Sequence, residues 1–199
     1  MHRRLTVYGQ IVPARERIML EHTVDEGAVA DLVESSPFVP PGRQEIFRRG
    51  LVAGFRGDFL VSTHLLIPEL ENSLRYQLRL SGGIASRMKT DGTQPERMLP
   101  DLLKEAGLIG MFPQDLVFDL ESLLVEQGGP NLRHQLAHGM LEQHEYYSHA
   151  AQYLWWSVLR LCVLPLIHMR SEDDVSVSRE SGDGHEEQGA EGPAVDSSD

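Results

Sequence analysis

Cysteine is almost absent from this sequence, since Cys162 is the only one among 199 residues. A single thiol excludes an intrachain disulfide and any metal cluster that needs several cysteines. The N-terminal segment MHRRLTVYGQIVPARER also lacks the long apolar stretch and the small-residue cleavage site of a secretory signal. Together these absences favour a reducing, cytoplasmic location.

The short motifs of several common active sites are also missing. The sequence contains no G-x-S-x-G nucleophile turn and no phosphate loop of the G-x4-G-K-[ST] kind. His134 and His138 have the spacing of a zinc pair on a helix, and His144, Glu145 or His149 could complete it, but the HExxH order is absent. We therefore expect neither a metal nor another cofactor.

Lysine is scarce, because Lys89 and Lys104 are the only two and all other basic residues are arginines. Arginine suits bidentate contacts with phosphate better than lysine does. A codon bias toward arginine explains the same composition and is the simpler interpretation. Arginine richness alone therefore decides nothing about function.

The acidic charge is concentrated at the C-terminal end. The formal net charge is -12, and residues 171–199 contain ten acidic residues against one arginine. The preceding 170 residues therefore carry only about -3. The charge of the folded part does not argue against a polyanionic partner such as RNA.

The spacing of apolar residues predicts an all-α domain. Within residues 44–80, Gly57 and Asp58 predict a break between a short helix and a long one, because Asp58 can cap the helix that follows. Asn131 is predicted to cap a helix in the same way. Further helices are predicted over residues 13–35, with an interruption near Gly27 left open, and over 99–109, 112–127, 132–140 and 147–167.

Two segments are predicted to lie outside the helices. Residues 84–98, IASRMKTDGTQPERM, carry an Asp-Gly turn signal that predicts a small hairpin or an ordered loop. Beyond Met169 the composition shifts to serine, glycine and acidic residues, which predicts a disordered acidic tail. The expected organisation is an N-terminal extension over residues 1–14, a helical domain over 15–169 and the tail over 170–199.

One apolar stretch has nearly the length of a membrane span. Residues 153–169 read YLWWSVLRLCVLPLIHM, with Arg160 near the middle and Pro165 interrupting the run. An arginine at a bilayer centre costs roughly 2.5 to 3.5 kcal/mol even on the lenient insertion scale. The sequence therefore predicts a buried helix of a bundle here, and a membrane partner is not expected.

The segment NLRHQLAHGM, residues 131–140, contains an arginine followed after four intervening positions by a histidine. These are Arg133 and His138. On an ideal helix they lie about 140° apart, so the length of the arginine or a loosened turn must bring them together. His134, by contrast, lies four residues before His138 and shares its face.

This R-x4-H pattern resembles the RNxxxHG signature of an uncharacterised family of bacterial and eukaryotic domains, which is related to the HEPN superfamily of R-x4-6-H ribonucleases. The family most often has asparagine where this chain has His134, and histidine does occur there in HEPN proteins. The resemblance covers about residues 15–165. It includes the stretches PFVPPGRQEIFRRGLVAGFRGDF, HLLIPELENSLRYQL, FPQDLVFDLESLL and YLWWSVLRL.

The resemblance implies a HEPN-like helical bundle and an endoribonuclease that needs no metal and leaves a 2′,3′-cyclic phosphate. Such cleavage requires a base, an acid and positive charge near the phosphorus. His138 would be the base or the acid, because the pKa of a free histidine is about 6.5. Arg133 would hold the phosphate. As a lone pattern, the same residues would describe an exposed arginine and a histidine at a helix end.

Glu71, Asn72 and Arg75 form a polar group within the otherwise apolar stretch HLLIPELENSLRYQL. In the resemblance these residues would face the motif and orient Arg133, with Asn131 and His134 also in supporting positions. An ordinary solvated face with a Glu71–Arg75 pair explains the same residues. Both interpretations remain open at this point.

RNA is the expected partner, and no DNA partner is expected. A homodimer is implied by the resemblance, because HEPN domains commonly pair so that two motifs face one another. The alternative function is a non-catalytic helical module of the same family that binds RNA or a protein.

Overall fold

The computed structural model describes residues 2–82, 98–108, 110 and 112–182, and this part of the chain consists of helices and connecting turns without a strand. The prediction of an all-α protein is confirmed. The hairpin or ordered loop expected over residues 84–98 lies, apart from Met98, outside the described residues. The chain divides into two compact units, Met1–Pro165 and Leu166–Asp199, and the first contains the core and the motif.

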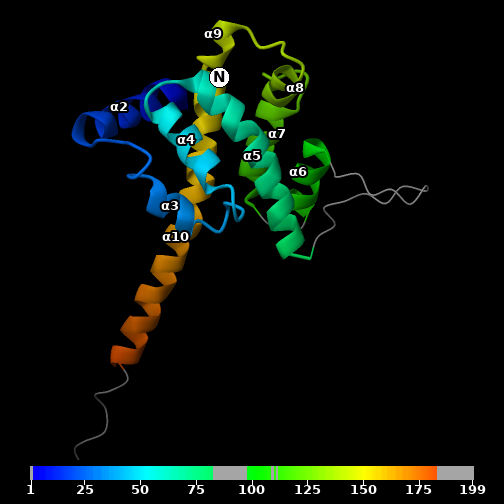
Figure 1. Cartoon of the computed structure of the whole chain (residues 1–199). Coiled ribbons are helices and arrows are strands. Elements are labelled where there is room, and N and C mark those ends of the chain that lie inside the picture. The colour runs from blue at the N-terminus through cyan, green and yellow to red at the C-terminus, as the bar shows by residue number, and fades with distance from the viewer. Residues whose placement is uncertain (1, 83–97, 109, 111, 183–199) are drawn as a thin grey trace, which may run out of the picture. The chain divides into compact units, whose positions relative to one another are not determined.

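The first unit is a helical bundle in which helices that follow one another in sequence also pack together. In Figure 1, α3 and α4 lie to the left of α5, whereas α6 and α8 lie to its right, and each successive pair of helices from α3 to α8 is in contact. The helices are α1 (His2–Thr6), the π-helical turn η1 (Val7–Ile11), α2 (Val12–Glu21), α3 (Ala30–Ser35), α4 (Gln44–Phe55), α5 (Phe59–Leu80), α6 (Leu99–Leu108), α7 (Gln114–Leu124), α8 (Leu132–Ala137), α9 (Gln143–Tyr146) and α10 (His149–Gly182).

Local signals placed several helix ends correctly. Helix α5 begins after Asp58, whose side chain accepts a hydrogen bond of 3.1 Å from the backbone N–H of Val61, as the capping prediction requires. Helix α7 begins directly after Pro113. The predicted helix over residues 13–35 is two helices, α2 and α3, because residues 22–29 form an extended segment and a turn.

The N-terminal residues belong to the bundle, which corrects the prediction of an extension over residues 1–14. Helix α1 and η1 cover residues 2–11, and Val7 and Ile11 are buried in the core. The side chain of Arg3 also bonds Asp119 on α7. Two buried side chains four residues apart are too short a signal to show an amphipathic helix in sequence.

Trp155 on α10 occupies the centre of the core. Its indole N–H donates a hydrogen bond of 3.0 Å to the carbonyl oxygen of Leu51 on α4. The rings of Phe55 and Phe59 meet it edge-on, with centroids 4.9 and 6.1 Å away. Gly54 allows this approach, because a Cβ atom there would lie 2.1 Å from the indole. The contact between α4 and α10 therefore depends on the large side chain of Trp155 and on the lack of a side chain at Gly54.

Helix α10 continues to Gly182, well past the end near residue 167 that the apolar pattern predicted. The first thirteen residues of the predicted tail, 170–182, are therefore helical, and residues 183–199 lie outside the described part of the chain. Charged and serine residues have adequate helix propensity, so an existing helix can extend into them without an apolar face.

The apolar stretch of α10 is the one part of the described chain that is long and apolar enough to cross a membrane. The segment Gln143–Ile167 has a mean hydropathy of 1.4, and 56% of its apolar window is buried inside the protein. Leu154, Trp155 and Val158 have at most 2% of their surface exposed. These side chains pack in the bundle core, as the sequence predicted for this helix.

Replacing Gly54 with alanine should destabilise the protein. The new methyl group would overlap the buried indole of Trp155, which has no room to move, and overpacking of this kind costs about 1–3 kcal/mol. Urea unfolding followed by circular dichroism measures the loss. Gly9→Ala is the control, because no atom lies within 4 Å of a Cβ there, and its stability should be unchanged or slightly higher. Equal stability of the two variants would contradict the packing.

Cys162 should be unreactive in the folded protein. Its side chain is fully buried, and burial raises the pKa of the thiol to about 12. At pH 8 only about one thiol in ten thousand would be ionised, whereas an exposed cysteine is substantially ionised. A thiol reagent such as Ellman's reagent should react slowly with native protein and rapidly after unfolding in guanidinium chloride. Equal rates in both states would show that the thiol is accessible.

Candidate functional site

A buried carboxylate on helix α5 marks the site. Glu71 is 7% exposed, and its carboxylate accepts a hydrogen bond from Arg75 one turn later on the same helix. A carboxylate in such a position must be paired, because an isolated buried charge is costly. The face of α5 that carries Glu71 is therefore not the ordinary solvated face that the sequence left open.

Arg133 from the motif completes this arrangement. Its Nε–H donates to Oε2 of Glu71 at 3.2 Å, while Arg75 occupies Oε1. Each carboxylate oxygen thus serves one arginine from a different helix. One carboxylate therefore contacts two guanidinium groups. The terminal nitrogens of Arg133 make no hydrogen bond within the described part of the chain, so they can receive an anion.

Helix α8, which carries the motif, is only six residues long. Asn131 precedes it, as predicted, but its backbone is left-handed with φ of 46° and its side chain makes no capping bond. The role predicted for Asn131 is therefore corrected: asparagine tolerates the left-handed region, and it is this backbone conformation that the position requires. The side chain of Gln135 bonds the carbonyl oxygen of Pro130 at 2.9 Å and closes this turn.

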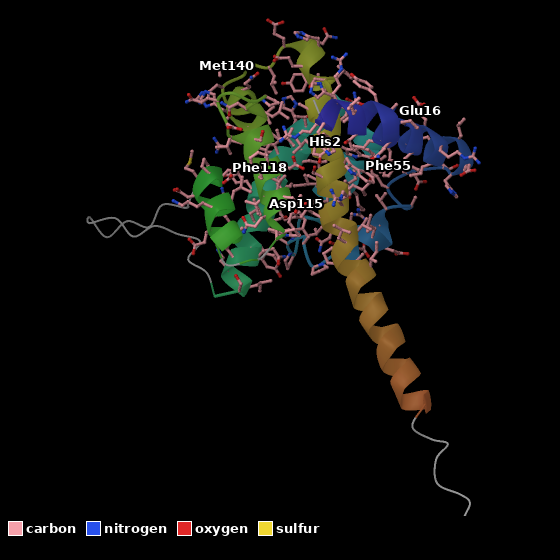
Figure 2. The ribbon with its side chains drawn as sticks, turned by 180° about the vertical axis from the view of Figure 1, so that it is seen from behind. His2, Glu16, Phe55, Asp115, Phe118 and Met140 are labelled. Carbon is pink, nitrogen blue, oxygen red and sulfur yellow. The ribbon has the colours of Figure 1, made fainter. Side chains whose placement is uncertain are left out.

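The helix stops at the second motif residue. Ala137 is the last helical residue, His138 caps the end, and Gly139 follows with a left-handed φ of 63°. The backbone N–H of Met140 then bonds the carbonyl of Gln135 at 2.8 Å. Glycine suits this position because other residues are strained there. Met140, labelled in Figure 2, is 49% exposed, so the chain leaves α8 toward solvent.

The two motif histidines pair with each other. The ring centroids of His134 and His138 lie 4.4 Å apart with the planes tilted by 54°, as their four-residue spacing predicts. Both side chains are exposed. Arg133 turns instead toward Glu71, and no hydrogen bond joins it to His138 in the described structure. The site therefore consists of a fixed arginine and an exposed histidine pair on the same short helix.

A shallow pocket of about 210 Å³ lies beside Arg133 and His134. Asn131 also lines it, together with apolar side chains of α6 and α7 such as Pro100 and Leu124. His138 is not among its lining residues. Arg133 and His134 therefore share a concave surface, and His138 lies outside it.

Asn72 is the one predicted supporting residue that the structure does not bring into this arrangement. Its side chain is partly buried on α5, next to Glu71 in sequence. No hydrogen bond joins it to Arg133 or His138 within the described residues. The neighbouring positions on a helix point about 100° apart, which explains why Glu71 reaches the motif and Asn72 does not.

Sequence reasoning missed a second polar pair on α5. His64 stacks on Tyr146 of α9 with centroids 5.1 Å apart, and its Nε2 lies 3.5 Å from the tyrosine hydroxyl. The His64 Nδ1 lies 2.9 Å from the carbonyl of Leu60. His64 and Glu71 are seven residues apart and so share a face of α5, a spacing that could have indicated a common surface.

The histidines and carboxylates of this region do not gather into a metal site. Within the described residues no group of three or more histidine, cysteine, aspartate or glutamate side chains is arranged to hold a metal ion. His144 instead lies 3.4 Å from Glu142 at the exposed start of α9. His149 lies at the start of α10, where it lines a different pocket.

Replacing Glu71 with glutamine should destabilise the protein and release Arg133. The amide cannot neutralise Arg133, and leaving a partly buried charged group without its partner costs about 1–3 kcal/mol. Urea unfolding measures this loss. Glu45→Gln is a matched control, because Glu45 also bonds two arginines, Arg48 and Arg49, but on an exposed helix face. That change should leave the free energy of unfolding nearly unchanged, because exposed ion pairs contribute little to stability. Equal losses would contradict the structural role of Glu71.

No family model, curated protein or solved structure matches the chain. The resemblance to the RNxxxHG family and the HEPN superfamily therefore stays a prediction from the sequence. A function has to be argued from the geometry of Arg133, Glu71 and the histidine pair.

Proposed function

We propose that the protein is a metal-independent endoribonuclease with Arg133 and His138 as its catalytic residues. The observation that supports this most is the fixed position of Arg133. A buried carboxylate holds its Nε, its terminal nitrogens make no hydrogen bond within the described residues, and the two exposed histidines follow it in the same short segment. Charge that is held in place before the substrate binds stabilises a transition state without reorganisation.

In the proposed reaction the RNA supplies its own nucleophile. The 2′-oxygen attacks the adjacent phosphorus, the P–O2′ bond forms and the P–O5′ bond breaks. His138 takes the proton of the 2′-hydroxyl or gives one to the leaving 5′-oxygen, and His134 beside it is placed to take the other role. Arg133 binds the non-bridging phosphate oxygens. The products are a 2′,3′-cyclic phosphate and a 5′-hydroxyl, with no net change in protons.

Glu71 and Arg75 are positioning residues in this proposal. They touch Arg133 or its partner and not the substrate. Because the carboxylate contacts Nε of Arg133 and not its terminal nitrogens, it orients Arg133 and leaves those nitrogens for the phosphate. RNA as the partner, a cytoplasmic location and a homodimer belong to the same proposal.

Cleavage of labelled single-stranded RNA in the presence of EDTA tests the proposal. Wild-type protein should cut and leave cyclic phosphate ends. His138→Ala should lose about two to four orders of magnitude in rate, and Arg133→Ala about two to three. His144→Ala and Arg17→Ala are matched controls, because both side chains are exposed and lie on other helices. They should cut like wild type.

Two outcomes would make the nuclease interpretation wrong. Either wild-type protein fails to cut RNA in EDTA, or His138→Ala cuts as fast as His144→Ala purified in the same way. Binding of RNA without cleavage would favour the alternative, a non-catalytic module on the same scaffold.

A further inference from the structure

A second, larger pocket lies next to Pro130, directly before the motif segment. Its volume is about 570 Å³, and α1, α7 and the start of α10 form its walls. Figure 2 shows His2 of α1 and Asp115 and Phe118 of α7 on the same side of the molecule, next to α10. A pocket of this size suits one small ligand.

One wall of the pocket is held rigid by an ionic network. The Arg3 guanidinium bonds Oδ1 of Asp119 at 3.2 Å, and the Tyr153 hydroxyl donates to Oδ2 at 2.8 Å. Burial and the nearby Asp119 raise the pKa of Tyr153 to about 12, so its hydroxyl stays protonated and keeps donating. The charge of Asp119 is thus already satisfied, and this carboxylate does not oppose an anion in the pocket.

Arg4 brings a guanidinium group to the pocket that no carboxylate in the described part of the chain pairs with. It is exposed, its guanidinium lies 6.0 Å from the Tyr8 ring centroid, and it forms no ion pair within the described part of the chain. Its field reaches His149, whose pKa is lowered first by burial and then by Arg4. The other charged groups on the pocket wall are Arg3, which Asp119 binds, the exposed His2 and the exposed Asp115.

Phe118 supplies an aromatic surface at the same pocket. The side chain is 66% exposed, although the other apolar side chains of α7, among them Val117 and Leu120, are buried. A free ring beside a cation is the combination that binds a nucleotide, because the base stacks on the ring and the phosphate meets the cation. Asp115, one turn earlier on α7, can accept a hydrogen bond from an amino group of the base.

Two consecutive residues of the segment before α8 line the two pockets. Pro130 lines the larger pocket, and the next residue, Asn131, lines the smaller pocket beside Arg133 and His134. We propose that the larger pocket is a nucleotide subsite, which binds one nucleotide of an RNA strand next to the phosphate held by Arg133; this inference rests on the proposed function. Arg4 contacts a phosphate of that nucleotide and Phe118 stacks on its base.

Equilibrium binding of RNA to the full chain tests this subsite. The His138→Ala variant serves as background, so that cleavage does not disturb the measurement, and a fluorescein-labelled single-stranded RNA is titrated by anisotropy. Adding Phe118→Ala should weaken binding about 5- to 100-fold through lost stacking. Adding Arg4→Ala should weaken it too and reduce the slope of log affinity against log salt by about 0.7, which is the signature of one phosphate contact.

Matched controls are available on helix α2. Leu20→Ala removes another exposed apolar side chain and Arg17→Ala removes another exposed arginine, and neither should change RNA affinity. Circular dichroism of all variants checks that they fold. Unchanged affinity and salt slope in both the Arg4 and Phe118 variants would overturn the subsite, as would equal losses in the α2 controls. Absence of any RNA binding would overturn it as well.

The outcomes separate the subsite from the nuclease. If wild type does not cut RNA but the Arg4 and Phe118 variants lose affinity, the subsite stands and the catalytic proposal fails. If wild type cuts RNA and these two variants bind and cut normally, the subsite fails and the catalytic proposal stands.

Discussion

The carboxylate of Glu71 fixes where the motif can lie. It is buried on the longest helix of the first unit, so it requires cationic partners, and it has one from its own helix and one from α8. An ion pair of this kind adds little stability by itself, but breaking it exposes the full cost of a buried charge. The orientation of α8 against α5 therefore depends on a polar constraint and not only on apolar packing.

This dependence matters because α8 is too short to be stable alone. Isolated helices of fewer than about twelve residues are marginal in water. The side chain of Leu132 anchors α8 in the core, and Arg133 joins α8 to α5 through its ion pair with Glu71. These contacts therefore also fix the positions of His134, on the exposed side of α8, and of His138, at its end. The chemistry of the motif is thus a property of α5 and α8 together.

What the sequence predicted well depends on local signals. The break at Asp58, the start of α7 after Pro113 and the His134–His138 pairing follow from capping, proline geometry and helical spacing. The contact between Arg133 and Glu71 joins residues 62 positions apart, so spacing alone left it as one of two interpretations. Residues 2–11 and the His64–Tyr146 pair were missed for the same reason.

The loss of Arg133 and the loss of Glu71 would have different consequences over evolution. A chain that lost Arg133 would still have Glu71 paired with Arg75, whereas a chain that lost Glu71 would leave Arg133 without its carboxylate partner. Substitutions should therefore be tolerated in a fixed order, with Arg133 replaced before Glu71. A descendant without Arg133 would then keep the Glu71–Arg75 pair, and Gly139 for its backbone conformation.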